Sequence, residues 1–187
     1  MNRMMKTCER SLLNQSIHGF HIVKKLGEGS YASVWLGQHP ITNCLVAIKS
    51  ISKERINDAI KITRFQRELS LMKSLDHPLI ASLFFYDQDD HYHYLGIEYA
   101  SKGDLQNYVN SHGKIIEPIA RKYFVQLISV LEYLHKEKRI INRDLKAENI
   151  LLDDNLNIRV VDFGLSNSFQ GDNPKFSTMC GSPGMFF

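Results

Sequence analysis

The spacing of apolar and polar residues changes along the chain and predicts three successive regions. Within the first fifty residues, apolar side chains lie in short β-rich runs at 20–26, 34–36 and 46–48. Turn-forming residues at 27–30 and 39–43 separate these runs. Short apolar runs bounded by such residues are typical of strands. We therefore expect an antiparallel meander in the first region.

A helical period follows the third run. Between residues 56 and 75, apolar residues recur at steps of three and four, at Ile62, Phe65, Leu69 and Met72. This spacing predicts an amphipathic helix. After this helix in the sequence, a second hairpin is predicted from strands at 80–85 and 92–99, joined by a polar turn at 87–90.

Beyond residue 100 the pattern favours helices. They are predicted at 105–109 and 117–136, and the longer one has an apolar stripe of Phe124, Leu127, Leu131 and Leu134. Short strands follow at 150–152 and 158–161, each beside a cluster of polar residues. Residues 164–187 have no periodicity, and we expect a loop there.

Composition and charge narrow the class of protein. The 187 residues are 43% hydrophobic and 23% charged, as in ordinary globular proteins. A formal net charge of +3 is too small and too dispersed to indicate nucleic acid as a partner. No stretch approaches the roughly 20 apolar residues of a membrane span, and the first 16 residues lack the apolar core of a secretory signal. Three widely spaced cysteines indicate reduced thiols, so we expect a cytoplasmic or nuclear protein.

Gly27 and Gly29 lie in a turn between two predicted strands. Such a loop can present backbone N–H groups to the phosphates of a nucleotide, although a plain glycine-rich hairpin explains it equally well. Lys49 lies in an apolar strand, where a buried ammonium is costly unless an anion meets it. That anion is a phosphate or a carboxylate. Glu68 on the predicted helix is the natural carboxylate partner, and an exposed helical glutamate is the alternative.

Two polar segments flank the predicted strands at 150–152 and 158–161. Residues 142–149 read Asn-Arg-Asp-Leu-Lys-Ala-Glu-Asn, and residues 161–164 read Val-Asp-Phe-Gly. Two acids, a lysine and an asparagine are suited to holding Mg²⁺ with oxygen ligands while orienting a hydroxyl nucleophile. A polar loop beside a hairpin would not require this set.

Taken together, these motifs resemble those of eukaryotic protein kinases. The family's order is kept by the glycine loop, by Val-Ala-Ile-Lys at 46–49, by the helix glutamate, by Arg-Asp-Leu-Lys at 143–146 and by Asp-Phe-Gly at 162–164. Asp144-Leu145-Lys146 resembles the Ser/Thr branch rather than the Tyr branch.

The resemblance covers about residues 20–183. Within the Ser/Thr branch, the segments at 162–167 and 180–183 look most like the AMP-activated, sucrose-non-fermenting and microtubule-affinity-regulating kinases. The implied cofactors are ATP and Mg²⁺, and the implied partner is a protein substrate.

The resemblance also implies a nucleotide site. Gly27 and Gly29 would cover the phosphates, and Lys49 would contact the α- and β-phosphates while paired with Glu68. Backbone groups from Glu98 to Ala100 would bind adenine. The other implied residues of this site are Leu26, Val34, Ala47, the gatekeeper Ile97, and Asp104, which would bind the ribose.

Four residues would carry the chemistry implied by the resemblance. Asp144 would accept the proton of the substrate hydroxyl, and Lys146 would stabilise charge on the transferred phosphoryl group. Asn149 and Asp162 would hold Mg²⁺.

Arg143 implies control by an upstream activating kinase. Its guanidinium would pair with a phosphate placed on the loop after Asp162. Thr178 is the first candidate for that modification, and Ser177 is the second.

The sequence departs from the family pattern at three points. Ala32 replaces the third glycine of the loop, which costs about 1 kcal/mol if the backbone there needs a positive φ. Asn142 replaces a histidine that packs on the phenylalanine of Asp-Phe-Gly, so we expect looser packing around Phe163. After 180–183 the sequence ends at Phe187, before the Ala-Pro-Glu segment and the helices that follow it in the family.

We therefore expect an α+β, protein-kinase-like fold. A flexible leader is expected at 1–19, and a complete N-terminal lobe of antiparallel sheet plus one helix, with the hinge, at 20–100. A partial, mostly helical C-terminal lobe is expected at 101–187. ATP-dependent phosphorylation of Ser/Thr hydroxyls is the expected activity. An ATP-binding pseudokinase or regulatory module, and a truncated non-functional kinase fragment, are the alternatives.

Overall fold

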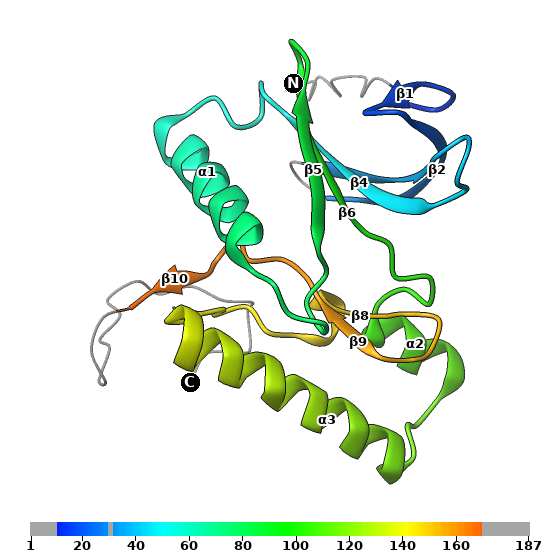
Figure 1. The fold of residues 1–187 in the computed structure, drawn as a ribbon, viewed down its shortest axis with the longest axis vertical. Coiled ribbons are helices and arrows are strands. Elements are labelled where there is room, and N and C mark those ends of the chain that lie inside the picture. Colours follow the sequence, from blue (N-terminus) through cyan, green and yellow to red (C-terminus); the bar gives the residue numbers. More distant parts are fainter. Residues whose placement is uncertain (1–10, 30–31, 170–187) are drawn as a thin grey trace, which may run out of the picture.

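A computed structural model describes residues 11–29 and 32–169 of the chain. Its upper part is a six-stranded antiparallel sheet with helix α1 beside it (Figure 1). Its lower part contains helices α2 and α3 and two small two-stranded sheets. The chain thus has the expected α+β organisation of a sheet-rich part followed by a mostly helical part.

The large sheet confirms the predicted meander and hairpin. Its strands run in the order β1-β2-β3-β4-β6-β5, and every neighbouring pair is antiparallel. Side chains alternate between the two faces of such a sheet. The strands are β1 (Ser16–Ile17), β2 (Phe20–Glu28), β3 (Ala32–Gln38), β4 (Leu45–Ser52), β5 (Leu83–Gln88) and β6 (Tyr92–Glu98).

The outer face of this sheet is covered by residues 11–19. Leu12 is 1% exposed and Ile17 is 7% exposed, and both pack with apolar side chains of β2 to β6. The expected flexible leader at 1–19 is therefore wrong for its second half, because its apolar side chains have a hydrophobic surface to cover. Residues 1–10 lie outside the described part of the chain.

Helix α1 (Ala59–Ser74) begins three residues later than predicted. Asp58 fixes the start, because its carboxylate accepts a hydrogen bond from the Lys61 N–H at 2.8 Å. Phe65 and Met72 are buried against the core, as the period predicts. Ile62, which the predicted apolar stripe includes, is 38% exposed.

Helices α2 (Leu105–His112) and α3 (Glu117–Glu132) form the lower part, and a π-helical turn (Tyr133–Lys138) continues α3. Of the predicted apolar stripe, Leu134 is buried and Leu127 packs against the core, whereas Phe124 does not. Tyr123 is buried, whereas Phe124 is 65% exposed. The two aromatic residues are adjacent, so a 3.6-residue period cannot decide which of them faces the core.

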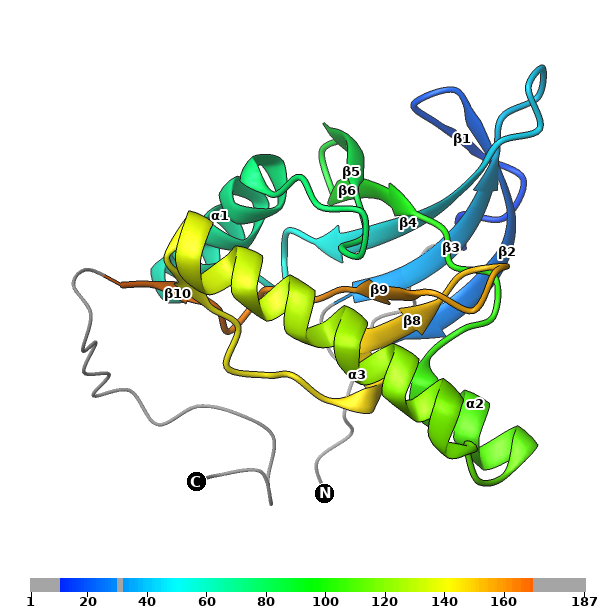
Figure 2. The same ribbon diagram turned by 60° about the horizontal axis from the view of Figure 1, so that its bottom comes forward.

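Two small two-stranded sheets anchor both ends of each of the polar segments at 142–149 and 161–164. Strand β8 (Ile150–Leu152) pairs with β9 (Ile158–Val160), and β7 (Ile140–Ile141) pairs with β10 (Asn167–Ser168). The first polar segment runs from β7 to β8 and ends in a short 3-10 turn (Ala147–Asn149), and the second runs from β9 to β10. Figure 2 shows β8 and β9 between α3 and the large sheet.

One hydrophobic core joins the upper and lower parts. It includes Leu95 of β6, Phe65 of α1, Val130 of α3 and Leu152 of β8. Backbone hydrogen bonds reinforce this junction: the Ala81 N–H donates to the Val160 carbonyl at 3.0 Å, and the Val160 N–H donates to the Leu79 carbonyl at 2.9 Å. Among the helices of residues 11–29 and 32–169, none is both long enough and apolar enough to cross a membrane.

Candidate active site

The inner face of the sheet carries the predicted nucleotide residues. Val34 of β3 pairs with Lys49 of β4, and Ala47 of β4 pairs with Ile97 of β6. Because residues two apart in a strand share a face, Ala47 and Lys49 project to the same side of the sheet. Leu26 lies further along the same sheet, on β2, and is 38% exposed. The structure thus places this predicted set on three neighbouring strands and at the end of β2.

The glycine turn leaves open space above its backbone. A Cβ atom on Gly27 would meet nothing within 4 Å, and one on Gly29 would meet only the Ala32 carbonyl oxygen, at 3.6 Å. The Gly29 N–H donates to that carbonyl at 2.8 Å, which closes the turn. Ala32 begins the extended strand β3 and pairs with Ile51 of β4, so the conditional cost of replacing the third glycine does not arise.

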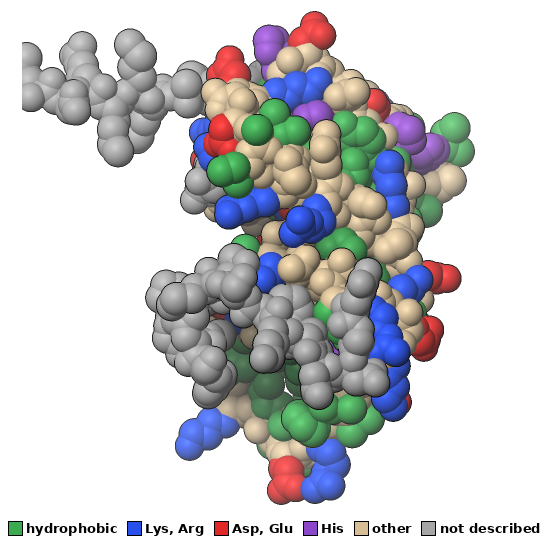
Figure 3. Space-filling model, turned by 90° about the vertical axis from the view of Figure 1, so that its left-hand side faces the viewer, with side chains coloured by type: hydrophobic (Ala, Val, Ile, Leu, Met, Phe, Trp, Pro, Cys, Tyr) green, Lys and Arg blue, Asp and Glu red, His purple; other side chains and the backbone are tan. Residues whose placement is uncertain are grey.

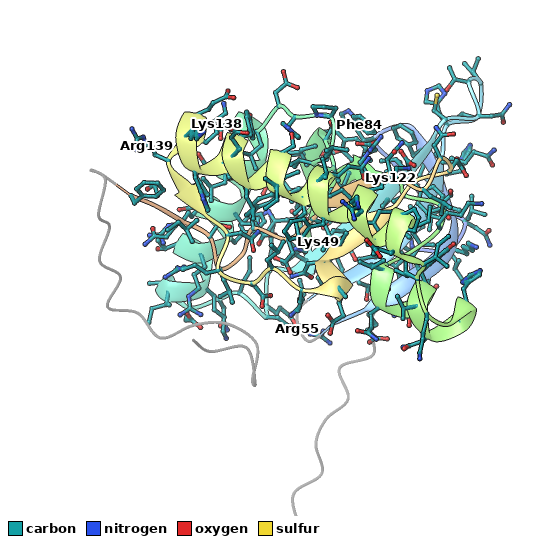
Figure 4. All side chains as sticks on the ribbon, turned by 90° about the horizontal axis from the view of Figure 1, so that it is seen from below. Lys49, Arg55, Phe84, Lys122, Lys138 and Arg139 are labelled. Atoms are coloured by element: carbon teal, nitrogen blue, oxygen red, sulfur yellow. The ribbon has the colours of Figure 1, made fainter. Side chains whose placement is uncertain are left out.

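Lys49 and Glu68 form an ion pair between β4 and α1. The Lys49 Nζ lies 2.7 Å from the Glu68 Oε1, and the two side chains are 24% and 12% exposed. Burial disfavours the Lys49 ammonium, but the negative charges of Glu68 and Asp162 outweigh burial and raise the pKa of Lys49 above 10.5. Lys49 is therefore charged at neutral pH. Figure 4 shows it near the centre of the molecule, whereas Arg55 and Arg139 lie near the margins.

A pocket of about 350 Å³ opens at this ion pair. Gly29, Lys49, Glu68 and Asp162 all line it, so the glycine turn, the lysine and the Asp-Phe-Gly aspartate face one space. The Lys49 ammonium and the Asp162 carboxylate both line this space. This combination suits a phosphate chain accompanied by a cation.

Asp144 is surrounded by the other residues of its loop. Its carboxylate Oδ2 lies 3.0 Å from the Lys146 Nζ and accepts a hydrogen bond from the Asn149 Nδ2 at 3.1 Å. The same Nδ2 also donates to the Asp144 carbonyl at 2.9 Å. The Asp144 side chain is 11% exposed. A carboxylate held in this way has a fixed direction and remains an acceptor for a substrate hydroxyl proton.

The residues predicted for Mg²⁺ fit that ion. The Val161 N–H donates to the Asn149 carbonyl at 3.0 Å, which brings the two polar segments together. Asn149 directs its Nδ2 to Asp144, and the Gly164 N–H donates to the Asp162 Oδ1 at 3.0 Å. The Asn149 Oδ1 and the Asp162 carboxylate supply hard oxygen ligands of the kind that Mg²⁺ takes.

These oxygen ligands would not complete a magnesium shell. Across the described ranges, no group of three or more His, Cys, Asp or Glu side chains could hold a metal ion. Mg²⁺ usually keeps several water ligands and binds one or two protein side chains together with substrate phosphates. The donor set is therefore suited to a cation that arrives with a nucleotide.

The carboxylates of Glu98 and Asp104 already have partners. The Glu98 carboxylate accepts hydrogen bonds from the Arg159 Nε at 2.8 Å and from the Ser82 N–H at 3.3 Å, and the Glu98 N–H donates to the Ser82 carbonyl at 2.9 Å. Ala100, which follows two residues later, is buried. Asp104 caps α2: its two oxygens accept hydrogen bonds from the Asn107 N–H at 2.8 Å and from the Asn107 Nδ2 at 2.7 Å. The Asp104 carboxylate, which is predicted to bind a ribose, is thus already engaged in capping the N-terminus of α2.

A second pocket, of about 460 Å³, lies between α1 and the segment after Asp-Phe-Gly. Arg64, Arg67 and Arg143 line it. Sequence reasoning identified Arg143 but missed the other two, although their three-residue spacing beside Glu68 places them on one side of α1. In the space-filling view from the α1 side, Lys and Arg side chains lie across the middle of the molecule (Figure 3). The candidate phosphosites Thr178 and Ser177 lie outside the described residues.

This architecture is that of a protein kinase. It combines an antiparallel sheet, a helix α1 whose Glu68 forms an ion pair with Lys49 of that sheet, and two polar loops that small sheets anchor. The profile of the protein kinase domain matches residues 20–186, and the chain belongs to this family. NUAK family SNF1-like kinase 1 of Mus musculus is 41% identical over 167 residues, which cover 89% of this chain and 25% of the mouse protein. The Homo sapiens protein of the same name matches with the same identity and coverage.

These relatives confirm the predicted resemblance to sucrose-non-fermenting-type kinases. This chain spans about a quarter of their length.

Proposed function

We propose that this chain transfers the γ-phosphoryl group of ATP to Ser or Thr hydroxyls of protein substrates. The observation that carries the proposal is the convergence of Lys49, Glu68 and Asp162 on the pocket under the glycine turn. Asp144, Lys146 and Asn149 are joined to one another in the adjoining loop. A phosphoryl transferase needs both a phosphate site and a positioned carboxylate beside it.

The roles of the side chains follow from their contacts. Lys49, kept charged by Glu68, would bind the α- and β-phosphates of ATP. The Asp144 carboxylate would accept the proton of the substrate hydroxyl as that oxygen attacks the γ-phosphorus. Lys146, 3.0 Å from Asp144, would balance the negative charge that develops on the transferred group.

Mg²⁺ would be held by the Asn149 Oδ1 and the Asp162 Oδ2. When bound, it neutralises charge on the β- and γ-phosphates. The ion pair between Lys146 and Asp144 keeps a cation beside the base before a substrate arrives. The hydrogen bond from Asn149 to Asp144 links the metal site to the base.

Transfer of radiolabel from γ-labelled ATP to a generic protein substrate tests the proposal. We expect Mg²⁺-dependent incorporation on Ser or Thr that Asp144→Ala abolishes. Asp154→Ala, an exposed acid of the β8–β9 turn, is the matched control and should retain the label. Absence of transfer by the unaltered chain would reject the proposal.

A nucleotide-binding module without phosphoryl transfer is the second candidate. The observation in its favour is the apolar surface of α3, where Phe124, Val125 and Ile128 are 65%, 62% and 45% exposed. An uncovered apolar surface weakens the part of the fold that carries Asp144. Stabilisation of the chain by ATP against heat, without transfer of label, would favour this candidate.

The arginine pocket supports the proposal that an upstream kinase regulates the chain. Arg64, Arg67 and Arg143 would bind a phosphate attached at Thr178 or Ser177. A chain carrying phosphothreonine at position 178 should transfer more label than the unmodified chain. Arg67→Ala should remove most of that gain, whereas Arg121→Ala, on the exposed face of α3, should not.

A further inference from the structure

Asn142 lies between the two polar loops and uses both ends of its side-chain amide. The Nδ2 donates to the carbonyl of Asp162 at 3.3 Å, and the Oδ1 accepts a hydrogen bond from the N–H of Asp144 at 3.0 Å. Asn142 is 3% exposed. A buried amide with one donor bond and one acceptor bond has a fixed orientation.

The backbone around these bonds adopts a rare conformation. Asp162 has a φ of 64° and Arg143 has a φ of 65°, both in the left-handed region that non-glycine residues seldom occupy. The Asn142 side chain donates to the Asp162 carbonyl, and Asn142 directly precedes Arg143 in the sequence. Such backbone persists only where surrounding contacts hold it in place.

Ser166 extends the connection into the segment after Asp-Phe-Gly. Its hydroxyl donates to the Asn142 carbonyl at 3.3 Å, and its N–H donates to the Phe163 carbonyl at 3.0 Å. Ser166 is 1% exposed and Phe163 is 2% exposed. Phe163 is thus buried in the core beside this polar connection, although Asn142 is smaller than the histidine of the family pattern.

We propose that Asn142 is a positioning residue, which sets the Asp162 ligand through the Asp162 carbonyl and the Asp144 base through the Asp144 N–H. The proposal rests on the function proposed above, because it assigns a task to Asn142 within that site. The amide carries its donor and its acceptor on one carbon, so one side chain can serve both backbone groups. Asparagine thus couples the proton acceptor to the metal ligand in a single side chain.

Two variants separate the two bonds. Asn142→Asp keeps an acceptor for the Asp144 N–H but loses the donor to the Asp162 carbonyl and places a carboxylate against it. Asn142→Leu, of similar size, loses both bonds. Asn110→Asp, the same substitution on the exposed side of α2, is the matched control.

The first measurement is binding of a fluorescent ATP analogue to the full chain with and without Mg²⁺. For Asn142→Asp, we expect the gain in affinity that Mg²⁺ provides to fall about tenfold, as the loss of a buried hydrogen bond predicts. Affinity without Mg²⁺ should stay within about twofold of the unaltered chain. General damage to the fold would weaken both affinities together, and that outcome, or an unchanged Mg²⁺ gain, overturns the proposal.

The second measurement is amide hydrogen exchange of Asp144 in the absence of nucleotide. Exchange should be about tenfold faster in Asn142→Leu and nearly unchanged in Asn142→Asp and Asn110→Asp. Equal exchange in the unaltered chain and in Asn142→Leu overturns the proposal. If the unaltered chain shows no Mg²⁺ gain, the proposed function fails, and the exchange result alone decides whether Asn142 fixes Asp144.

Discussion

Phe85 of β5 lies over Gly96 of the neighbouring strand β6 and occupies the space that a side chain at position 96 would need. The two residues are cross-strand partners, and a Cβ atom built on Gly96 would overlap the Phe85 ring. The same ring stacks on His18, with centroids 4.3 Å apart, and on Phe20, with centroids 5.6 Å apart. A large residue paired with a glycine thus supports the layer that residues 11–19 add to the sheet.

Gly96→Val should destabilise the chain by about 1–3 kcal/mol, because the added side chain overpacks this contact. Chemical denaturation measures the change. Gly27→Ala is the control, since a Cβ atom there meets nothing within 4 Å. Adding Phe85→Leu to Gly96→Val should recover part of the loss, and a double variant as unstable as the sum of the two singles would contradict the predicted contact.

Leu12→Ala should lower the free energy of unfolding by about 2–5 kcal/mol, as expected for truncating a fully buried leucine. Leu12 is 1% exposed, whereas its neighbour Leu13 is 46% exposed. Leu13→Ala is therefore a control of identical chemistry, and its effect should stay within about 0.5 kcal/mol. Equal effects of the two substitutions in a denaturation experiment would show that residues 11–19 do not pack on the sheet.

Glu68→Gln should make nucleotide binding sensitive to alkaline pH. Burial disfavours the charge of Lys49, and Glu68 with Asp162 reverses that effect and raises the pKa of Lys49 above 10.5. Without the Glu68 charge this pKa falls, so the ammonium is lost at a lower pH. Titration of a fluorescent ATP analogue between pH 7 and pH 10 should show a decline only in this variant. Glu117→Gln, which removes an exposed charge from α3, should behave like the unaltered chain.

Stability should fall as the pH drops below about 6.5. Burial lowers the pKa of His77, against the charges of Glu137 and Asp76, and burial together with the Lys53 charge lowers the pKa of His93. The unfolded chain then binds protons more tightly than the folded chain, so the contribution of these residues is present above pH 6.5 and is lost as the pH falls.

Unfolding curves at pH 7.5 and pH 5.5 measure this loss. His77→Asn is the informative variant, because its amide oxygen can still accept the Leu79 N–H that now donates to the His77 Nδ1 at 3.2 Å. This variant should lose less stability on acidification than the unaltered chain. An identical loss in both proteins would show that His77 does not titrate with folding.

The sequence alone predicted the elements whose period is strong and uninterrupted. The meander, the second hairpin and α1 are examples, and the Lys49–Glu68 pair follows once strand and helix are placed. Local patterns could not reveal which of Tyr123 and Phe124 faces the core, because that choice depends on the packing of α3 against distant strands. Leu12 was missed for the same reason, since most buried residues of its cluster, such as Trp35 and Phe85, are more than twenty residues away in the sequence.

Motifs in the sequence predicted the residue types of the candidate site. They could not predict the contacts that form only when distant segments of the chain meet. The sequence identified Asp144, Asn149 and Asp162. It could not show that Asp104 caps a helix or that Arg159 holds Glu98, because both contacts depend on how the segments meet. It also associated Asn142 with a loss of packing, whereas the fold gives its amide two hydrogen bonds.

The backbone bonds of Val160 tie the upper and lower parts of the molecule together at one residue. This residue exchanges hydrogen bonds with the segment before β5 and pairs with Ile150 of β8, so it belongs to both parts at once. Asp162 follows two residues later. Asp162, the predicted Mg²⁺ residue, is therefore attached two residues from a point that both parts of the molecule hold, whereas the glycine turn is attached to the upper sheet alone.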